Sequence, residues 1–289
     1  MLSISSGELT AQINPMGAEL SSIQTRNGAE LMTNADPKFW AGRAPLLFPI
    51  VGRLHDDVAR IYGGQYHMPQ HGLARHQQFD VVHHGEDEIT LQLRENDKSL
   101  AQYPFAFALD AYFKVAGATL YQKITVKNMG DGDMPFSFGF HPAFAWPLPF
   151  GAAKDVHEII FEHDEPAQLC VISSEATIAH EMKDGPVKKD RFTPHDDMFA
   201  NDALVWRELN SRSLIYGDAG GAHLAIDFPD TPWLGIWTKP GAAYLCIEPW
   251  AGMADPQGFT GDFTEKPGIM MLAKGEERSF RMDVTLKLG

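Results

Sequence analysis

Cysteine is scarce in this chain of 289 residues, and the features of an exported or membrane protein are missing. Cys170 and Cys246 are its only cysteines, too few for a disulfide framework and without a Cys-x-x-Cys pair that would indicate a metal site. The first residues do not combine a basic segment with an apolar one, and no uncharged apolar run reaches membrane-spanning length. These absences predict a cytoplasmic protein with reduced thiols.

Positive charge is also in short supply. The 24 Lys and Arg residues against 38 Asp and Glu residues leave a net charge of −14, which repels nucleic-acid phosphates and anionic lipid heads. We therefore expect neither nucleic acid nor a membrane surface as a partner. No flexible linker, internal repeat or low-complexity tract divides the sequence, so residues 1–289 are expected to form a single domain.

The sequence does contain many short segments in which apolar and polar residues alternate, as half-buried strands require. Examples occur at residues 9–13, 89–93 and 120–126, and at residues 280–288, where the apolar side chains of Phe280 through Leu288 fall on one face. Glycine-rich turn signals separate these segments. The pattern predicts an all-β sandwich or meander. Short helices are expected only near residues 37–40, after Asp36 as a possible cap, and near residues 198–204.

Three further segments carry residues suited to proton transfer: 70–75 (QHGLAR), 138–144 (FGFHPAF) and 244–250 (YLCIEPW). A carboxylate and an imidazole in an aromatic pocket can act as base and acid near neutral pH. Simpler interpretations exist for each residue. His141 could be an inert core histidine, Glu248 a solvated acid at a strand end, and His71 an ordinary loop histidine.

In order and spacing, these segments, together with 48–54 (FPIVGRL) and 247–255 (IEPWAGMAD), resemble the aldose 1-epimerase (mutarotase) superfamily, and most of all its bacterial LacX-type branch. The resemblance covers essentially the whole chain. It implies a large antiparallel β-sandwich that needs no metal or organic cofactor, takes a small-molecule sugar as its substrate, and interconverts the α and β anomers of a free or phosphorylated aldose. We expect a monomer or a homodimer.

By this resemblance Glu248 is the general base, His141 the general acid, His71 a substrate-binding histidine and Arg53 an arginine near the sugar hydroxyls. The sugar-binding aspartate of the family matches Asp202, with Asp197 as the next choice. Reference pKa values of about 4.3 for Glu and about 6.5 for His allow both roles without large shifts. They predict a bell-shaped dependence of the rate on pH.

Other residues leave alternatives open. Arg53 and Arg75 could pair with nearby aspartates on the surface, or bind sugar hydroxyls or a phosphate. The histidines next to acidic pairs, His55 and His195, lack a second histidine at a ligand spacing, so we expect no metal site. Trp40, Trp233 and Trp237 could line a sugar groove or simply fill the core, whereas Trp250 offers a flat face of the kind on which sugars stack. A non-catalytic carbohydrate-binding or sensing protein on the same fold is the alternative to the epimerase.

Overall fold

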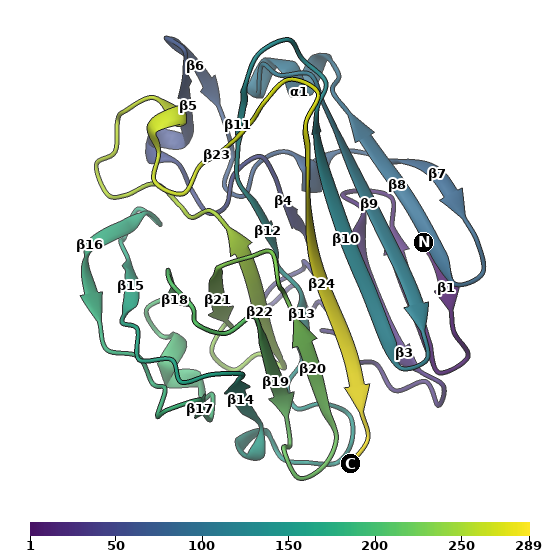
Figure 1. The fold of residues 1–289 in the computed structure, drawn as a ribbon. Coiled ribbons are helices and arrows are strands. Elements are labelled where there is room, and N and C mark those ends of the chain that lie inside the picture. Colours follow the sequence, from purple (N-terminus) through teal and green to yellow (C-terminus); the bar gives the residue numbers. More distant parts are fainter.

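The computed structural model describes residues 1–289 and consists mainly of antiparallel strands arranged in two layers (Figure 1). The first layer is a nine-stranded sheet that contains β7 (Asp80–His84), β8 (Glu88–Arg94), β9 (Phe107–Ala116), β10 (Thr119–Asn128), β14 (Glu158–Phe161), β17 (Arg191–Phe192), β19 (Ser213–Gly217), β20 (His223–Asp227) and β24 (Glu277–Lys287). Its order is β17-β14-β19-β20-β24-β10-β9-β8-β7.

The second layer carries the candidate site. It contains an eight-stranded sheet made of β4 (Leu46–Leu47), β12 (Phe138–Phe140), β13 (Ala143–Ala145), β15 (Leu169–Ile172), β16 (Ile178–Lys183), β18 (Leu204–Trp206), β21 (Trp233–Trp237) and β22 (Tyr244–Ala251). The order is β16-β15-β18-β21-β22-β12-β4, and β13 also pairs with β22. A three-stranded sheet of β1 (Leu2–Ser5), β2 (Leu9–Asn14) and β3 (Glu19–Thr25) packs against β9 and β10.

Short elements complete the fold. Two small two-stranded antiparallel sheets are formed by β5 (Val58–Ile61) with β6 (Gly64–His67), and by β11 (Met134–Phe136) with β23 (Met270–Leu272). The helical segments are α1 (Asp97–Gln102) and the 3-10 turns η1 (His55–Asp57), η2 (Ala74–His76), η3 (Lys154–Val156), η4 (Asp196–Phe199) and η5 (Phe263–Glu265). None of these helices has the length and apolar character needed to cross a membrane.

The alternating pattern at the end of the chain is confirmed in β24. Phe280, Met282, Val284 and Leu286 are buried in the main core, while Arg281 on the other face is exposed. β24 pairs with both β20 and β10, so it lies inside the nine-stranded sheet with one face toward solvent. Leu288, which the pattern placed with the core side chains, follows the strand and is exposed.

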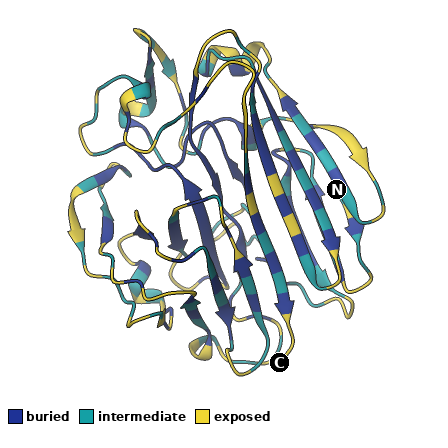
Figure 2. Ribbon diagram, in the orientation of Figure 1, coloured by how far each residue is buried: buried dark blue, intermediate teal, exposed yellow.

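The eight-stranded sheet is apolar on both faces. Along β22, Leu245 and Ile247 point into the core between the layers, whereas Cys246 and Trp250 belong to separate apolar clusters on the opposite face. All eight residues of β22 are buried, and the strand is dark blue throughout in Figure 2. That opposite face is covered by loops and holds the candidate site.

Neither of the two helices expected from the sequence forms an α-helix in the structure. Residues 37–39 form a turn, in which the Asp36 carboxylate accepts a hydrogen bond from the Lys38 amide at 2.9 Å but no helix follows. The second segment, 198–204, overlaps only the end of the 3-10 turn η4, after which the chain enters β18. Both segments are too short for an α-helix, because their few helical hydrogen bonds would not offset the conformational entropy lost when the backbone is ordered.

Candidate active site

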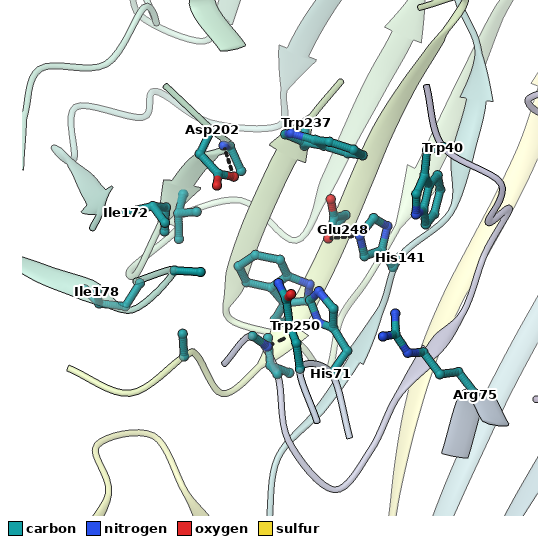
Figure 3. A pocket seen from close by; sticks show the side chains of 17 residues that line it. Trp40, His71, Arg75, His141, Ile172, Ile178, Asp202, Trp237, Glu248 and Trp250 are labelled. Carbon is teal, nitrogen blue, oxygen red and sulfur yellow. Dashed lines mark hydrogen bonds and ion pairs between the residues drawn. The ribbon is translucent and has the colours of Figure 1, made fainter. Parts of the chain in front are cut away.

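A cavity of about 270 Å³ opens over the outer face of the eight-stranded sheet. Its lining combines aromatic and aliphatic walls with a few polar side chains, as ligand sites in proteins usually do. The residues that line it are Trp40, Val51, Gly52, Gln70, His71, Arg75, His141, Ile172, Ala176, Ile178, Asp202, Ala203, Val205, Trp237, Glu248, Trp250 and Ala254. Residues from segments far apart in the chain, between Trp40 and Ala254, therefore meet here (Figure 3).

Glu248 lies in the middle of the cavity floor. The alternation of β22 directs Leu245 and Ile247 into the core and turns Glu248 to the cavity side, between Cys246 and Trp250. Only 2% of the residue is exposed. The interpretation of this acid as a solvated residue at a strand end is therefore wrong.

His141 faces Glu248 from the turn between β12 and β13. Its Nε2 lies 3.2 Å from Oε2 of Glu248, and the dashed line in Figure 3 marks this contact. His141 is 8% exposed. The short strands on either side fix the turn, because Gly139 of β12 pairs with Trp250, and Ala143 of β13 pairs with Cys246.

Burial shifts both members of this pair away from their ordinary pKa values. Desolvation raises the pKa of the Glu248 carboxyl well above its usual value, and the nearby Asp202 carboxylate raises it further. Desolvation lowers the pKa of His141 to about 3, and the charge of Arg75 acts in the same direction. The expectation of unshifted pKa values does not hold, because both charged forms lose hydration inside the cavity.

His71 presents a defined nitrogen to the cavity. Its Nδ1 accepts a hydrogen bond from the Gly52 amide at 3.2 Å, so in the neutral ring the proton is on Nε2. Burial lowers its pKa and favours this neutral form. The backbone of His71 is left-handed, with φ 65°, and the adjacent Gly72 leaves no room for a Cβ against the Phe48 carbonyl.

Arg75 extends from η2 toward the cavity and makes no salt bridge. Its Nε donates to His76 Nε2 at 3.1 Å, and Glu19 influences it only at longer range. The guanidinium thus has donors left for a ligand.

Arg53 does not line the cavity. It makes a bidentate pair with Asp57, with both N–O distances at 2.7 Å, and its side chain is 42% exposed. The neighbouring Gly52 lines the cavity in its place. Of the alternatives for Arg53, the structure shows pairing with a surface aspartate.

Asp202 lies on the cavity rim, across from His141 (Figure 3). It has a positive φ of 95°, and its Oδ1 accepts a hydrogen bond from the Ala203 amide at 2.7 Å. Asp197, the other choice for the sugar-binding aspartate, is exposed in η4 and is not among the lining residues.

Of the three tryptophans whose role the sequence left open, Trp40 and Trp237 line the cavity and Trp233 does not. Trp250 lies against glycines on both neighbouring strands. A Cβ added to Gly235 would be 2.5 Å from its ring, and one added to Gly139 would be 2.6 Å from it. Trp40 and Trp237 form the wall beside His141 (Figure 3). The glycines on the two flanking strands were a possible signal in the sequence. They could not be connected with Trp250, because the order of the strands in the sheet was unknown.

One set of donor atoms has the composition of a metal site. Ligand atoms of His141, Cys246 and Glu248 lie within 4.8 Å of one another. Cys246 is not among the lining residues, however, and burial raises the pKa of its thiol, which opposes the thiolate that a metal requires. His141 and Glu248 already contact each other. The arrangement is better suited to moving a proton than to holding an ion.

Comparisons with known proteins are consistent with this geometry. A family model described as aldose 1-epimerase matches residues 1–285. The plasmid-encoded protein LacX of Lactococcus lactis subsp. lactis is 28% identical, and the match covers 96% of each chain.

Solved structures show the same fold. A galactose mutarotase related enzyme from Lactobacillus acidophilus is 29% identical with a TM-score of 0.88, covering 99% of this chain and 96% of that one. A galactose mutarotase-like protein from Lactobacillus casei is 27% identical with a TM-score of 0.93, covering 99% and 100%. These matches extend over the complete two-layer architecture described above.

Proposed function

The chain belongs to the aldose 1-epimerase family, and we propose that it interconverts the α and β anomers of an aldose, with Glu248 as general base and His141 as general acid. The observation that carries the proposal is the buried contact of 3.2 Å between His141 Nε2 and Glu248 Oε2 on the floor of the cavity. A base and an acid held together in this way can serve two oxygens attached to the same carbon.

Ring opening requires two proton transfers. Glu248 takes the proton of the C1 hydroxyl while the bond between C1 and the ring oxygen breaks, and His141 gives its proton to that oxygen. The products are an open-chain aldehyde, a protonated Glu248 and a neutral His141. After rotation about the C1–C2 bond, the two residues exchange roles and the ring closes on the other face.

The other polar groups are suited to holding the sugar. His71 offers its Nε2–H, and Arg75 offers guanidinium donors that no carboxylate occupies. Asp202 offers a carboxylate from the opposite rim. The face of Trp250 provides a flat apolar surface of the kind on which sugars stack. The free guanidinium is also compatible with a phosphorylated aldose.

Anomer exchange measured by NMR saturation transfer tests the proposal. A panel of aldoses and their 6-phosphates is compared in the wild type, Glu248→Gln and His141→Gln. Asp197→Asn serves as a matched control for Asp202→Asn, because both aspartates are exposed but only Asp202 lines the cavity.

We expect acceleration above the buffer rate that is lost in the Glu248 and His141 variants, weakened by Asp202→Asn and unchanged by Asp197→Asn. Sugar binding without acceleration in the wild type would contradict the proposal and favour a carbohydrate-binding protein.

A further inference from the structure

The indole of Trp40 stacks on the His141 ring. The two centroids lie 4.8 Å apart and the planes are inclined by 26°, which is a face-to-face arrangement, and Figure 3 shows the rings side by side. Trp40 also contacts Trp237 and Tyr244 through ring edges and tilted faces. It therefore covers the side of His141 that neither Glu248 nor His71 occupies.

The backbone around Trp40 holds this position. The Trp40 amide donates to the Asp36 carbonyl at 3.0 Å, and a Cβ at Gly42 would overlap the indole. The next residue, Arg43, donates from Nη1 to the Thr33 carbonyl at 2.7 Å, and its own carbonyl accepts from the Ala143 amide at 2.8 Å. The Trp40 loop is thereby tied to the segment that carries His141.

The other groups around His141 differ in whether they favour or oppose its protonation. Glu248 contacts Nε2, and the neutral His71 ring meets the His141 ring edge-on with centroids 5.5 Å apart. The charge of Arg75 opposes protonation of His141, and the Cys246 thiol is kept neutral by burial. The second ring nitrogen, Nδ1, is buried and makes no hydrogen bond to another residue. No carboxylate therefore accepts a hydrogen bond from Nδ1 to stabilise the protonated His141 ring.

We propose that Trp40 is a positioning residue that holds the His141 ring against Glu248 and stabilises its protonated form through the face of the indole. The negative face of an indole attracts a cation, most strongly where water is excluded. The inference rests on the proposed function in one respect: the epimerase would transfer the proton of His141 to the ring oxygen of the sugar. The stacking itself makes the active arrangement, ionised Glu248 with protonated His141, more populated.

The experiment compares wild type with Trp40→Phe, which keeps an aromatic face, and Trp40→Leu, which keeps only apolar bulk. Nitrogen-15 NMR of histidine-labelled protein reports the ratio of protonated to neutral His141 from pH 2.5 to pH 8, a range that includes its pKa of about 3, with the signal assigned from its loss in His141→Gln. Trp233→Leu is the matched control, because it removes an indole from the same sheet face at a residue that does not line the cavity.

We expect Trp40→Leu to lower the ratio of protonated to neutral His141 roughly five- to tenfold, and kcat by a similar factor. Trp40→Phe should keep most of both, and Trp233→Leu should leave the ratio unchanged. Equal effects of Phe and Leu, an unchanged ratio, or a ring that is neutral in every protein would overturn the proposal. The NMR ratio needs no turnover, so it tests Trp40 even if the wild type fails to exchange anomers.

Discussion

Glu248 and His141 exchange their usual order of acidity when they are buried together. In water a glutamate loses its proton before a histidine does, but in this cavity desolvation raises the pKa of Glu248 and lowers that of His141 to about 3. Between these limits the pair holds one proton, which these pKa values place mainly on Glu248 and which can pass to His141 across their contact of 3.2 Å. Such a pair is ready to open the ring in either direction without exchanging protons with solvent.

This order of acidity predicts a broad pH profile. As the pH falls through about 3, His141 takes up a second proton while Glu248 keeps its own, so the base is lost. As the pH rises through the elevated pKa of Glu248, the pair loses its last proton and the acid is lost. We therefore expect kcat/KM for anomer exchange to be flat between these limits.

Measuring the rate from pH 3 to pH 9 tests this profile. The unshifted values expected from sequence would instead produce a narrow bell with limbs near about 4.3 and about 6.5. Limbs at those positions would show that the cavity is more hydrated than the burial of the pair indicates.

His71 is predicted to contribute one hydrogen bond to the substrate. His71→Asn retains a residue that tolerates the left-handed backbone and can accept from the Gly52 amide, but its side chain is too short to replace Nε2. We expect a loss of roughly tenfold in kcat/KM, the size of one hydrogen bond. A variant as active as wild type in steady-state exchange assays would remove His71 from the substrate contacts.

At the scale of elements, β22 and its two neighbours form a platform. Trp250 on β22 lies flat because Gly139 on β12 and Gly235 on β21 have no side chains to lift it. A flat indole leaves room above the sheet for a ligand. The apolar packing of Trp250 with Leu47 and Val205 then holds it in place.

Gly235→Ala tests the platform. The added methyl group would lie 2.5 Å from the indole, so we expect Trp250 to tilt into the cavity and sugar binding to weaken by more than about tenfold. Overpacking should also lower the free energy of unfolding by about 1–3 kcal/mol. Titration calorimetry and chemical denaturation measure the two effects.

Gly132→Ala is the control for this substitution, because nothing lies within 4 Å of a Cβ there and its φ is not positive. If both variants bind sugar equally well, the indole does not need to lie flat.

For a strand with one face toward solvent, the sequence shows which side chains point into the core. For a strand buried on both faces, the sequence does not show which face each side chain lies on. In β24 the polar residues alternate with the core, so the sequence shows which side is which. In β22 both faces are apolar, and Glu248 is the only acid among eight buried residues. Its environment depends on the loops that cover the second face, which no local pattern records.

At the scale of the whole molecule, the cavity collects segments that are far apart in the chain. Resemblance to a family identified Glu248, His141 and His71, and the fold brings these three together. The resemblance placed Arg53 near the sugar hydroxyls, whereas in the structure Arg53 pairs with Asp57 and Arg75 lines the cavity. Trp40 likewise reaches His141 only because its loop is bound to the segment that carries His141, and Trp237 only because β21 lies beside β22.

Asp255 joins three distant segments behind the cavity wall. Its Oδ2 accepts from the His55 amide at 2.9 Å, its own amide donates to the Arg53 carbonyl, and its carbonyl accepts from the Ile178 amide. Lys266 is buried beside it and donates to the Met253 carbonyl. The attraction between Asp255 and Lys266 offsets part of the desolvation of both groups.

This buried lysine should make the stability of the molecule depend on alkaline pH. Burial lowers the pKa of Lys266 from 10.5 to about 8, so above pH 8 the folded state releases a proton that the unfolded chain keeps. The free energy of unfolding should therefore rise by up to about 3 kcal/mol between pH 8 and pH 10.5, relative to a variant without this group.

Urea denaturation of wild type and Lys266→Met across this range isolates the contribution of Lys266. At high pH the variant should be less stable than wild type, because it lacks the hydrogen bond to Met253. The difference in the free energy of unfolding should become smaller toward pH 8, because the wild type then carries a buried charge on Lys266. Lys274→Met, which removes an exposed lysine, should run parallel to wild type. If Lys266→Met also runs parallel, water reaches Lys266 and the three segments behind the cavity separate more readily than their burial indicates.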